Sequence, residues 1–257
     1  MATVERAVDT VTEAGETPAA MAPVLLVQFP PIWGRNVSPF ALKLETWLRL
    51  SGIPFVVEAS TRLDKAPRGK FPYIVDAGER IGDSSLIIDH LKTTRGIDPD
   101  AGLSRRQKAE GVALQRLFEN HLYYLLVHSR WIDPLGWEGT SEHFFAAMPR
   151  PVRPLARAFF RRKVRRLLHG QGFGRHSSAE LRDFARTDLE AIAEHLGEKP
   201  FFLGEQLTSV DAVAFGFLAN ILLVPLQTEL QEITREFPNL VAWCEAMEAG
   251  IYGGGDS

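Results

Sequence analysis

The amino-terminal part of the chain carries two short apolar runs on either side of an amphipathic segment. Val24 to Phe29 and Pro54 to Glu58 have the composition of short strands. Between them, Ser38-Pro39 favours a helix start, because serine is a common N-cap and proline suits the first helical position. Gly52 is a natural stop. This helix would present one apolar face, made of Phe40, Leu44, Trp47 and Leu48.

The segment from Gly69 to Leu91 predicts a strand, a tight turn, a second strand and a helix. Phe71-Pro72 leads into the first strand, and a proline without a donor for the ladder suits a strand entry or a cis turn. Ala77-Gly78 is the expected hairpin connection. Asp83-Ser84 supplies a capping side chain just before apolar residues at helical spacing.

The pattern becomes helical after Thr94, and Gly96 to Ser104 is the expected linker. Thr208 to Asp211 has the Ser/Thr-x-x-acid spacing of a capping box. The longest apolar run, Ala212 to Leu226, is shorter than the ~20 residues that span a bilayer and therefore predicts a buried core helix. Three further helices are expected, over Arg105 to Trp131, Ser178 to Leu196 and about Asn239 to Met247.

Composition narrows the function classes only modestly. The chain has 257 residues, 45% of them hydrophobic, which suits two small globular domains. A net charge of −3 gives no general reason to expect nucleic acid as a partner. The single Cys244 excludes an intrachain disulfide and a metal site made of cysteines alone, and it predicts an ordinary packed thiol. No metal is expected.

The amino-terminal segment Met1 to Ala22 is rich in Ala, Thr and Glu and shows no apolar pattern. It predicts a disordered tail. It lacks the apolar core of a secretory signal, and its acidic balance is wrong for a mitochondrial presequence. The expected location is the cytoplasm.

The segment 150–175 is strongly basic, with nine Arg and Lys residues and no acidic residue. A solvated helical face is the usual explanation of such a run. Phe159, Phe160, Leu167 and Leu168 interleave with these charges, however. An amphipathic face that meets an anionic membrane, an acidic partner or an anionic ligand is the alternative.

These motifs carry a family resemblance. The stretch GKFPYIVDAGERIGDSSLIIDHL resembles the second half of the thioredoxin-like domain of glutathione transferases. Three further stretches are similar to the failed axon connections proteins and their bacterial relatives, a branch near the metaxins: VQFPPIWGRNVSPFALKLETWLRLSGIPF, GQGFGRHSSAEL and KPFFLGEQLTSVDAVAFGFLANIL. The resemblance implies an α/β thioredoxin-like domain over residues 23–95. An all-α transferase-type domain over residues 104–250 would follow.

The resemblance also implies a glutathione site. Phe71, before a cis Pro72, would pair its main chain with the cysteinyl unit as an added strand. Ser84 at a helix start would bind the γ-glutamyl carboxylate, and Asp83 the amine or a charge of a partner subunit. The alternative for this pair is a simple N-cap. Lys70 is a candidate for the glycyl carboxylate, against the plainer description of a solvated lysine.

Ser38 is the candidate donor to the glutathione thiolate. A free thiol has a pKa of about 8.5, and a hydroxyl donor at a helix N-terminus favours the ionised form. The loop PPIWGRNV is longer than in ordinary transferases, which could hand this role to Asn36. The plainer alternative is that Ser38 only caps the helix. No tyrosine lies in this loop, which argues against a transferase of the tyrosine type.

The remaining candidates would line a cleft between the domains. Arg175, in GQGFGRHS, is a candidate ligand contact there, unless this segment only precedes a serine that caps the next helix. The candidate walls of the cleft are Phe40, His121, Tyr124 and Trp131. The function expected from the resemblance is conjugation of glutathione, as co-substrate, or a related thiol to a hydrophobic electrophile by a homodimer. The alternative is a non-catalytic adaptor or binding protein of metaxin-like type on the same fold.

Overall fold

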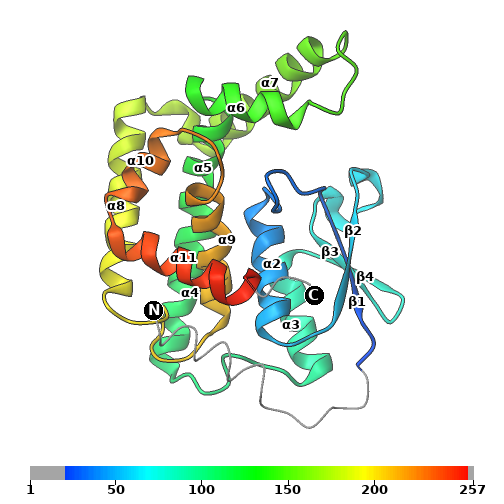
Figure 1. The fold of residues 1–257 in the computed structure, drawn as a ribbon, viewed down its shortest axis with the longest axis vertical. Coiled ribbons are helices and arrows are strands. Elements are labelled where there is room, and N and C mark those ends of the chain that lie inside the picture. Colours follow the sequence, from blue (N-terminus) through cyan, green and yellow to red (C-terminus); the bar gives the residue numbers. More distant parts are fainter. Residues whose placement is uncertain (1–20, 254–257) are drawn as a thin grey trace.

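The structure is a computed structural model and describes residues 21–253 (Figure 1). A four-stranded sheet forms the amino-terminal domain in the order β2-β1-β3-β4. β1 (Val24–Gln28) and β2 (Phe55–Ala59) are parallel and are joined by α2 (Pro39–Leu50). β3 (Tyr73–Asp76) and β4 (Glu79–Gly82) form an antiparallel hairpin, followed by α3 (Ser84–Arg95). The expected thioredoxin-like order is confirmed.

The register of the sheet brings three chain segments to one edge. Tyr73, the first residue of β3, pairs with Val27 near the end of β1 and with Gly82 at the end of β4. The residues just outside these ends therefore lie close together. The hairpin turns at Ala77-Gly78 with positive φ at both residues, as a two-residue turn requires, and the Phe71–Pro72 peptide bond is cis. Both sequence predictions are confirmed.

The second domain is entirely helical in the described residues. Its first helical column, expected as one helix, consists of α4 (Arg105–Leu117), a π-helical turn η3 (Phe118–Leu122) and α5 (Tyr123–Trp131). The last helix, α11 (Pro238–Tyr252), is longer than expected. The elements between them are α6 (Pro134–Phe144), α7 (Arg153–Gln171), η4 (Phe173–Arg175), α8 (Ser178–Leu196), α9 (Ser209–Leu222) and α10 (Glu229–Arg235).

Helix α9 is the core of this domain and confirms the expected buried helix. Every residue from Val210 to Leu222 is buried. Asp211 closes the predicted capping box by accepting from the Thr208 main-chain N–H and hydroxyl, and it also accepts from the Phe202 N–H. Within residues 21–253, no helix has both the length and the apolar character needed to cross a membrane.

The two domains meet where α2 packs against α9. Gly216 makes this contact possible, because a Cβ there would lie 2.6 Å from the Pro39 carbonyl oxygen and 2.8 Å from the main-chain nitrogen of Lys43. Beside it, the buried Lys43 of α2 forms an ion pair of 2.7 Å with Glu119 of η3. Burial lowers the pKa of Lys43, and Glu119 opposes that effect. The helical domain thus holds the helix that begins after Ser38.

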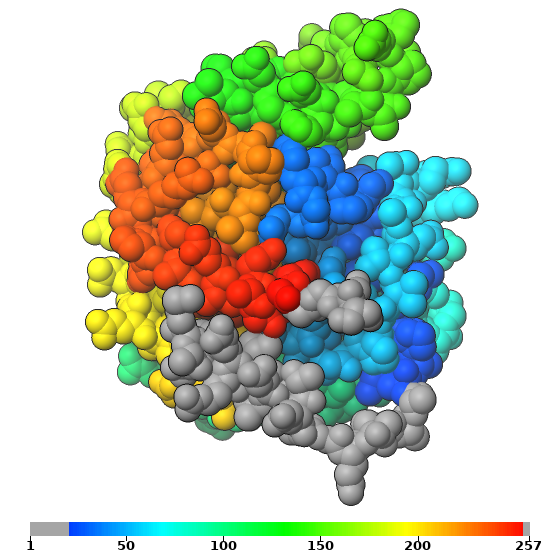
Figure 2. Space-filling view, viewed as in Figure 1, coloured from blue at the N-terminus to red at the C-terminus, as the bar shows by residue number. Residues whose placement is uncertain are grey.

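Helices α6 and α7 lie together at one end of the molecule (Figure 1). In the space-filling view they overhang the amino-terminal domain, with a hollow between the two (Figure 2). Short 3₁₀ turns, η1 (Leu63–Lys65) and η2 (Pro67–Gly69), complete the approach to β3.

Candidate functional site

The candidate site is the sheet edge at which β1 ends, β3 begins and α3 begins. The Phe29 and Phe71 rings meet edge to face, 4.8 Å apart, which joins the segment after β1 to the segment before β3. Asn36 donates to the Phe29 carbonyl at 2.9 Å and so brings the approach to α2 to the same place. The structure therefore gathers the starts of α2, β3 and α3.

The main-chain polar groups of Phe71 are unpaired in the described part of the chain. Neither its N–H nor its carbonyl makes a hydrogen bond within residues 21–253, although its ring is packed against Phe29 and Tyr73. An extended peptide can add to such a segment as a strand does. Lys70, the next candidate, is exposed, and its ammonium has no partner in the described part of the chain. This exposure agrees with the alternative of a solvated lysine.

Asp83 and Ser84 have different roles at the start of α3. Asp83 is the N-cap, and one carboxylate oxygen accepts from the N–H groups of Ser85 and Leu86 at 3.0 and 3.3 Å. Ser84 is only 5% exposed, and within the described residues neither its N–H nor its hydroxyl makes a hydrogen bond. The helix start therefore keeps two donors for an anion on Ser84.

Ser38 does not cap α2 with its side chain, which corrects the simplest expectation. The residue is at the N-cap position in extended conformation, but its hydroxyl makes no capping bond. The Asn36 side chain orders the preceding turn, since its carbonyl oxygen accepts from the Ser38 N–H at 3.0 Å while its amide donates to the Phe29 carbonyl. Asn36 is buried and positions Ser38. Within residues 21–253 the Ser38 hydroxyl makes no hydrogen bond and can act as a donor.

Two residues of the helical domain also hold this loop, and no pattern in the sequence points to them. Arg130 of α5 donates to the Val37 carbonyl at 2.8 Å and to the Asn220 side-chain oxygen at 2.9 Å. Asn220 of α9 donates to the Asn36 carbonyl at 3.3 Å. Their partners are 93 and 184 positions away in the sequence, so only the fold brings them together.

Arg130 is a buried cation without an anionic partner. It is 7% exposed, and no carboxylate within residues 21–253 pairs with it. Burial lowers the pKa of Arg130 to about 10, so its guanidinium remains charged at neutral pH. A buried charge compensated only by carbonyl oxygens favours an anion nearby.

A cavity of about 160 Å³ lies between Ser38 and the helical domain. Its walls are largely aromatic and aliphatic, with Arg130 among them. The lining residues are Phe29, Trp33, Val37, Ser38, Pro39, Tyr123, Leu126, Val127, Arg130, Trp131, Thr140 and Phe144. An engineered apolar cavity of about 150 Å³ holds benzene, so the volume suits a small organic molecule.

Of the four expected cleft walls, only Trp131 lines this cavity. Tyr123 lines the cavity in place of its neighbour Tyr124. Phe40 packs behind Tyr123, and His121 pairs with Asp188 of α8 at 2.5 Å.

Arg175 is not brought to this edge. It is exposed on η4, which packs against α7 and α5, and its guanidinium donates to the His169 carbonyl at 3.0 Å. The alternative for this segment holds, because Ser177 caps α8 in a capping box with Glu180.

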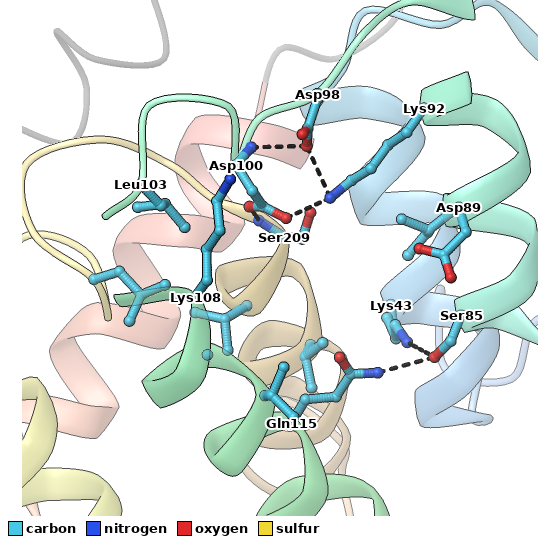
Figure 3. A pocket seen from close by; sticks show the side chains of 16 residues that line it. Lys43, Ser85, Asp89, Lys92, Asp98, Asp100, Leu103, Lys108, Gln115 and Ser209 are labelled. Carbon is cyan, nitrogen blue, oxygen red and sulfur yellow. Dashed lines mark hydrogen bonds and ion pairs between the residues drawn. The ribbon is translucent and has the colours of Figure 1, made fainter. Parts of the chain in front are cut away.

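A larger cavity of about 290 Å³ lies on the other side of the domain interface, between α3, α4 and α9 (Figure 3). Lys92 pairs there with Asp98 at 2.8 Å and with Asp100, whose other oxygen accepts from the Ser209 N–H. Ser85 accepts from Lys43 and Gln115 on the opposite wall (Figure 3). Because these polar groups mostly satisfy one another, we assign this cavity to the domain interface.

No cluster of three or more potential metal ligands exists within residues 21–253. Cys244 is fully buried in α11, and burial raises the pKa of its thiol, which confirms a packed cysteine.

Comparison with known proteins decides the family. Residues 39–136 match the model described as glutathione S-transferase N-terminal domain, and residues 185–247 match that of the glutathione S-transferase C-terminal domain. The isoprene-epoxide–glutathione S-transferase of Rhodococcus sp. (strain AD45) is 36% identical over 224 residues, which cover 84% of this chain and 93% of the relative. The chain belongs to the glutathione S-transferase family.

Other relatives of the chain place it near the expected branch. Failed axon connections of Drosophila melanogaster is 30% identical over 83% of the chain, which spans about half (54%) of that protein. Metaxin-1 of Macaca fascicularis is 32% identical over 82% of the chain and 70% of its own length. The resemblance to the failed axon connections and metaxin branch is confirmed.

The fold agrees with solved glutathione S-transferase-like structures. A beta-etherase from Sphingobium sp. strain SYK-6 superposes with a TM-score of 0.61, covering 90% of this chain and 98% of that one at 18% identity. At this identity the likeness concerns the fold alone. It confirms a thioredoxin-like domain followed by a helical transferase-type domain.

Proposed function

We propose that this protein conjugates glutathione, or a related thiol, to a small hydrophobic electrophile. The observation that carries the proposal is the set of free groups at one sheet edge: the open main chain of Phe71, the two donors of Ser84 and the free hydroxyl of Ser38. The first would pair with the cysteinyl unit, the second with the γ-glutamyl carboxylate and the third with the thiolate. Asp83 keeps one carboxylate oxygen for the ligand's amine.

The electrophile would occupy the 160 Å³ cavity, because Ser38 lines it. The isoprene-epoxide–glutathione S-transferase of Rhodococcus is named for an epoxide, which makes isoprene epoxide the first electrophile to assay. Glutathione-dependent loss of the epoxide, above the rate without protein, is the expected result. A native protein that binds no glutathione and accelerates no conjugation would instead support the non-catalytic alternative.

We further propose, as a second function, that α7 docks the protein on an anionic lipid surface. Its outward face combines exposed apolar side chains, Leu155 at 75% and Phe159 at 62%, with exposed cations. No ion pair with a carboxylate engages any of the nine basic residues of segment 150–175 within residues 21–253. Exposed apolar and cationic residues on one helix suit the boundary of an anionic bilayer.

The docking test uses vesicles of phosphatidylcholine with and without phosphatidylglycerol. Arg162, Lys163 and Arg166 are exposed and are reversed to Glu, whereas Arg161 is left intact because it donates to the carbonyls of Trp131 and Ile132. The native protein should bind only the anionic vesicles and should release them as salt shortens the Debye length. A triple reversal at the exposed cations Lys65, Arg68 and Arg80 is the matched control.

Equal binding by native and reversed proteins would contradict lipid docking. Absence of vesicle binding combined with salt-sensitive capture of an acidic protein would assign α7 to a protein partner instead. We also expect the protein to act in detoxification, in the cytoplasm and as a homodimer; cell fractionation tests the location and light scattering tests the dimer.

A further inference from the structure

Four arginines of the basic segment 150–175 line one hollow beside α6, about 560 Å³ in volume. Trp137 of α6 forms part of its wall, and most of the rest comes from Arg150, Arg153, Arg157 and Arg161. We call these four arginines the arginine cluster. No acidic side chain lines the hollow, and no carboxylate within residues 21–253 pairs with any of the four. Like charges gathered around one hollow repel one another, so an anion placed between them lowers the electrostatic energy.

Main-chain carbonyls hold two members of the arginine cluster in place. Arg153 donates to the carbonyls of Ala146 and Met148 at 2.6 and 2.8 Å. Arg161 donates to two carbonyls at the end of α5, at 3.0 and 3.1 Å. Both arginines are half-buried, and the pKa of Arg161 is lowered by its burial and by the positive charges of neighbouring arginines. Carbonyl oxygens position these guanidinium groups without neutralising them, so the wall of the hollow is positively charged before any ligand binds.

The other two members of the arginine cluster make no hydrogen bond within the described residues. Arg157 is half-buried, and its guanidinium carbon lies 5.7 Å from the centroid of the Trp137 ring. Arg161 covers the same ring at 4.9 Å, so one indole holds two guanidinium groups beside each other. Arg150 is exposed. Stacking on the indole orders the Arg157 side chain without using its N–H donors, which therefore remain available to a ligand.

The position of the arginine cluster on α7 separates it from the lipid-docking face. Leu155 and Phe159 carry the exposed apolar surface of that face, and Arg157 and Arg161 each follow two residues later. Two residues correspond to ~200° around a helix, so the arginines lie on nearly the opposite side of α7. A bilayer that contacts Leu155 and Phe159 would leave the hollow facing the solvent. We therefore expect its ligand to be a soluble compound.

The chemistry of the guanidinium group selects the anion. Its planar fork of N–H donors matches two oxygens of a phosphate or a carboxylate at once. A single carboxylate carries one charge, whereas a terminal phosphate carries about two at pH 7 and so complements a cluster of arginines better. We propose that the arginine cluster binds a soluble phosphorylated small molecule through a terminal phosphate or diphosphate group. A volume of about 560 Å³ lies in the range of ligand pockets and leaves room for the organic part of such a molecule.

Calorimetric titration with inorganic pyrophosphate, at physiological ionic strength and without lipid, tests the site. The native protein should bind pyrophosphate, and Arg157→Gln should weaken binding about 10- to 100-fold through loss of charge-assisted hydrogen bonds. Arg157→Lys keeps the charge without the fork and should restore only part of the affinity. Arg165→Gln is the matched control, because it removes one charge from an exposed residue of α7 that does not line the hollow. It should change the affinity by less than about threefold.

A spectroscopic signal locates the bound anion. The indole ¹⁵N–H signal of Trp137, assigned by its loss in Trp137→Phe, should shift as pyrophosphate binds. Arg150→Gln provides a second comparison with the control if Arg157→Gln fails to fold. Absence of pyrophosphate binding to the native protein, or equal losses of affinity in the Arg157 and Arg165 variants, would overturn the inference in favour of a solvated basic face. Equal affinity for citrate and pyrophosphate would overturn the assignment to a phosphorylated ligand.

Discussion

The Arg130 guanidinium, in the helical domain, donates a hydrogen bond of 2.8 Å to the carbonyl of Val37, the residue immediately before Ser38. The proposed thiolate donor is therefore held by a charge from the other domain. The same guanidinium lines the cavity that Ser38 faces. The cavity that Ser38 and Arg130 line is therefore built from both domains.

Removal of the Arg130 charge should weaken the acidity of bound glutathione. In Arg130→Gln, the pKa of the bound thiol is expected to rise by about one unit, because a buried cation near a thiolate favours its ionised form. Arg130→Lys should restore part of the effect. Ultraviolet titration of the bound thiol measures it, and Arg116→Gln, at an exposed arginine of α4, is the control. An unchanged thiol pKa in a folded Arg130→Gln would confine the residue to a structural role.

Ser38→Ala should slow conjugation and raise the pKa of the bound thiol with little loss of stability. An N-cap serine normally contributes about 1 kcal/mol, but the Ser38 side chain makes no capping bond, so the free energy of unfolding should change by less than ~0.5 kcal/mol. Urea unfolding and single-turnover kinetics separate the two effects. A large loss of stability with unchanged turnover would return Ser38 to a capping role.

Gly216→Ala should separate α2 from α9. A Cβ would meet the Pro39 carbonyl oxygen at 2.6 Å, and backbone atoms cannot move aside cheaply. The free energy of unfolding should fall by roughly 1–3 kcal/mol, the usual cost of overpacking. Gly170→Ala in α7, where nothing lies within 4 Å of the new Cβ, is the matched control and should be neutral or stabilising. Glutathione turnover should fall with the first variant only, because Pro39 adjoins Ser38.

Asp211 should make stability depend on pH. Burial raises the pKa of Asp211 to about 6 from 3.8. A carboxyl whose pKa is higher in the folded state contributes stability at low pH, below about 4, and that contribution is lost as the pH rises through about 6. A difference of this size between the folded and unfolded pKa of Asp211 corresponds to ~3 kcal/mol. Asp211→Asn should remove this dependence between pH 4 and 7 in urea unfolding. The exposed Asp183→Asn should keep it, and equal pH profiles for all three proteins would contradict the assignment.

Local patterns predicted most of the fold. The hairpin turn at Ala77-Gly78 and the capping of α3 by Asp83 follow from neighbouring residues, so they could be read directly from the sequence. The side-chain cap predicted at Ser38 is absent, because the N–H groups of Ala41 and Leu42 bond to the Ser38 carbonyl, and Asn36 accepts from the Ser38 N–H itself. Tyr124, a predicted cleft wall, does not line the cavity whereas its neighbour Tyr123 does, and nothing in the local sequence distinguishes the two tyrosines.

The sequence predicted only those residues of the candidate site that lie close to one another along the chain. Phe71, Asp83 and Ser84 belong to one hairpin and the helix after it, and the register of β3 and β4 guarantees that they meet. Arg130 and Thr140 come from the other domain, and their positions depend on how α5 and α6 pack. Charge or hydropathy patterns do not encode such a contact.

Calorimetric titration with glutathione is the decisive test of the proposed thiol site. The native protein should bind glutathione, and Ser84→Ala should lower the affinity by about 1–3 kcal/mol through loss of a charge-assisted hydrogen bond. Ser178→Ala changes the same first helical position of α8, on an exposed residue, and should leave binding unchanged. Circular dichroism confirms that both variants remain folded. Absence of glutathione binding to the native protein, or equal affinity in native and folded Ser84→Ala, would contradict the assignment of this sheet edge to glutathione.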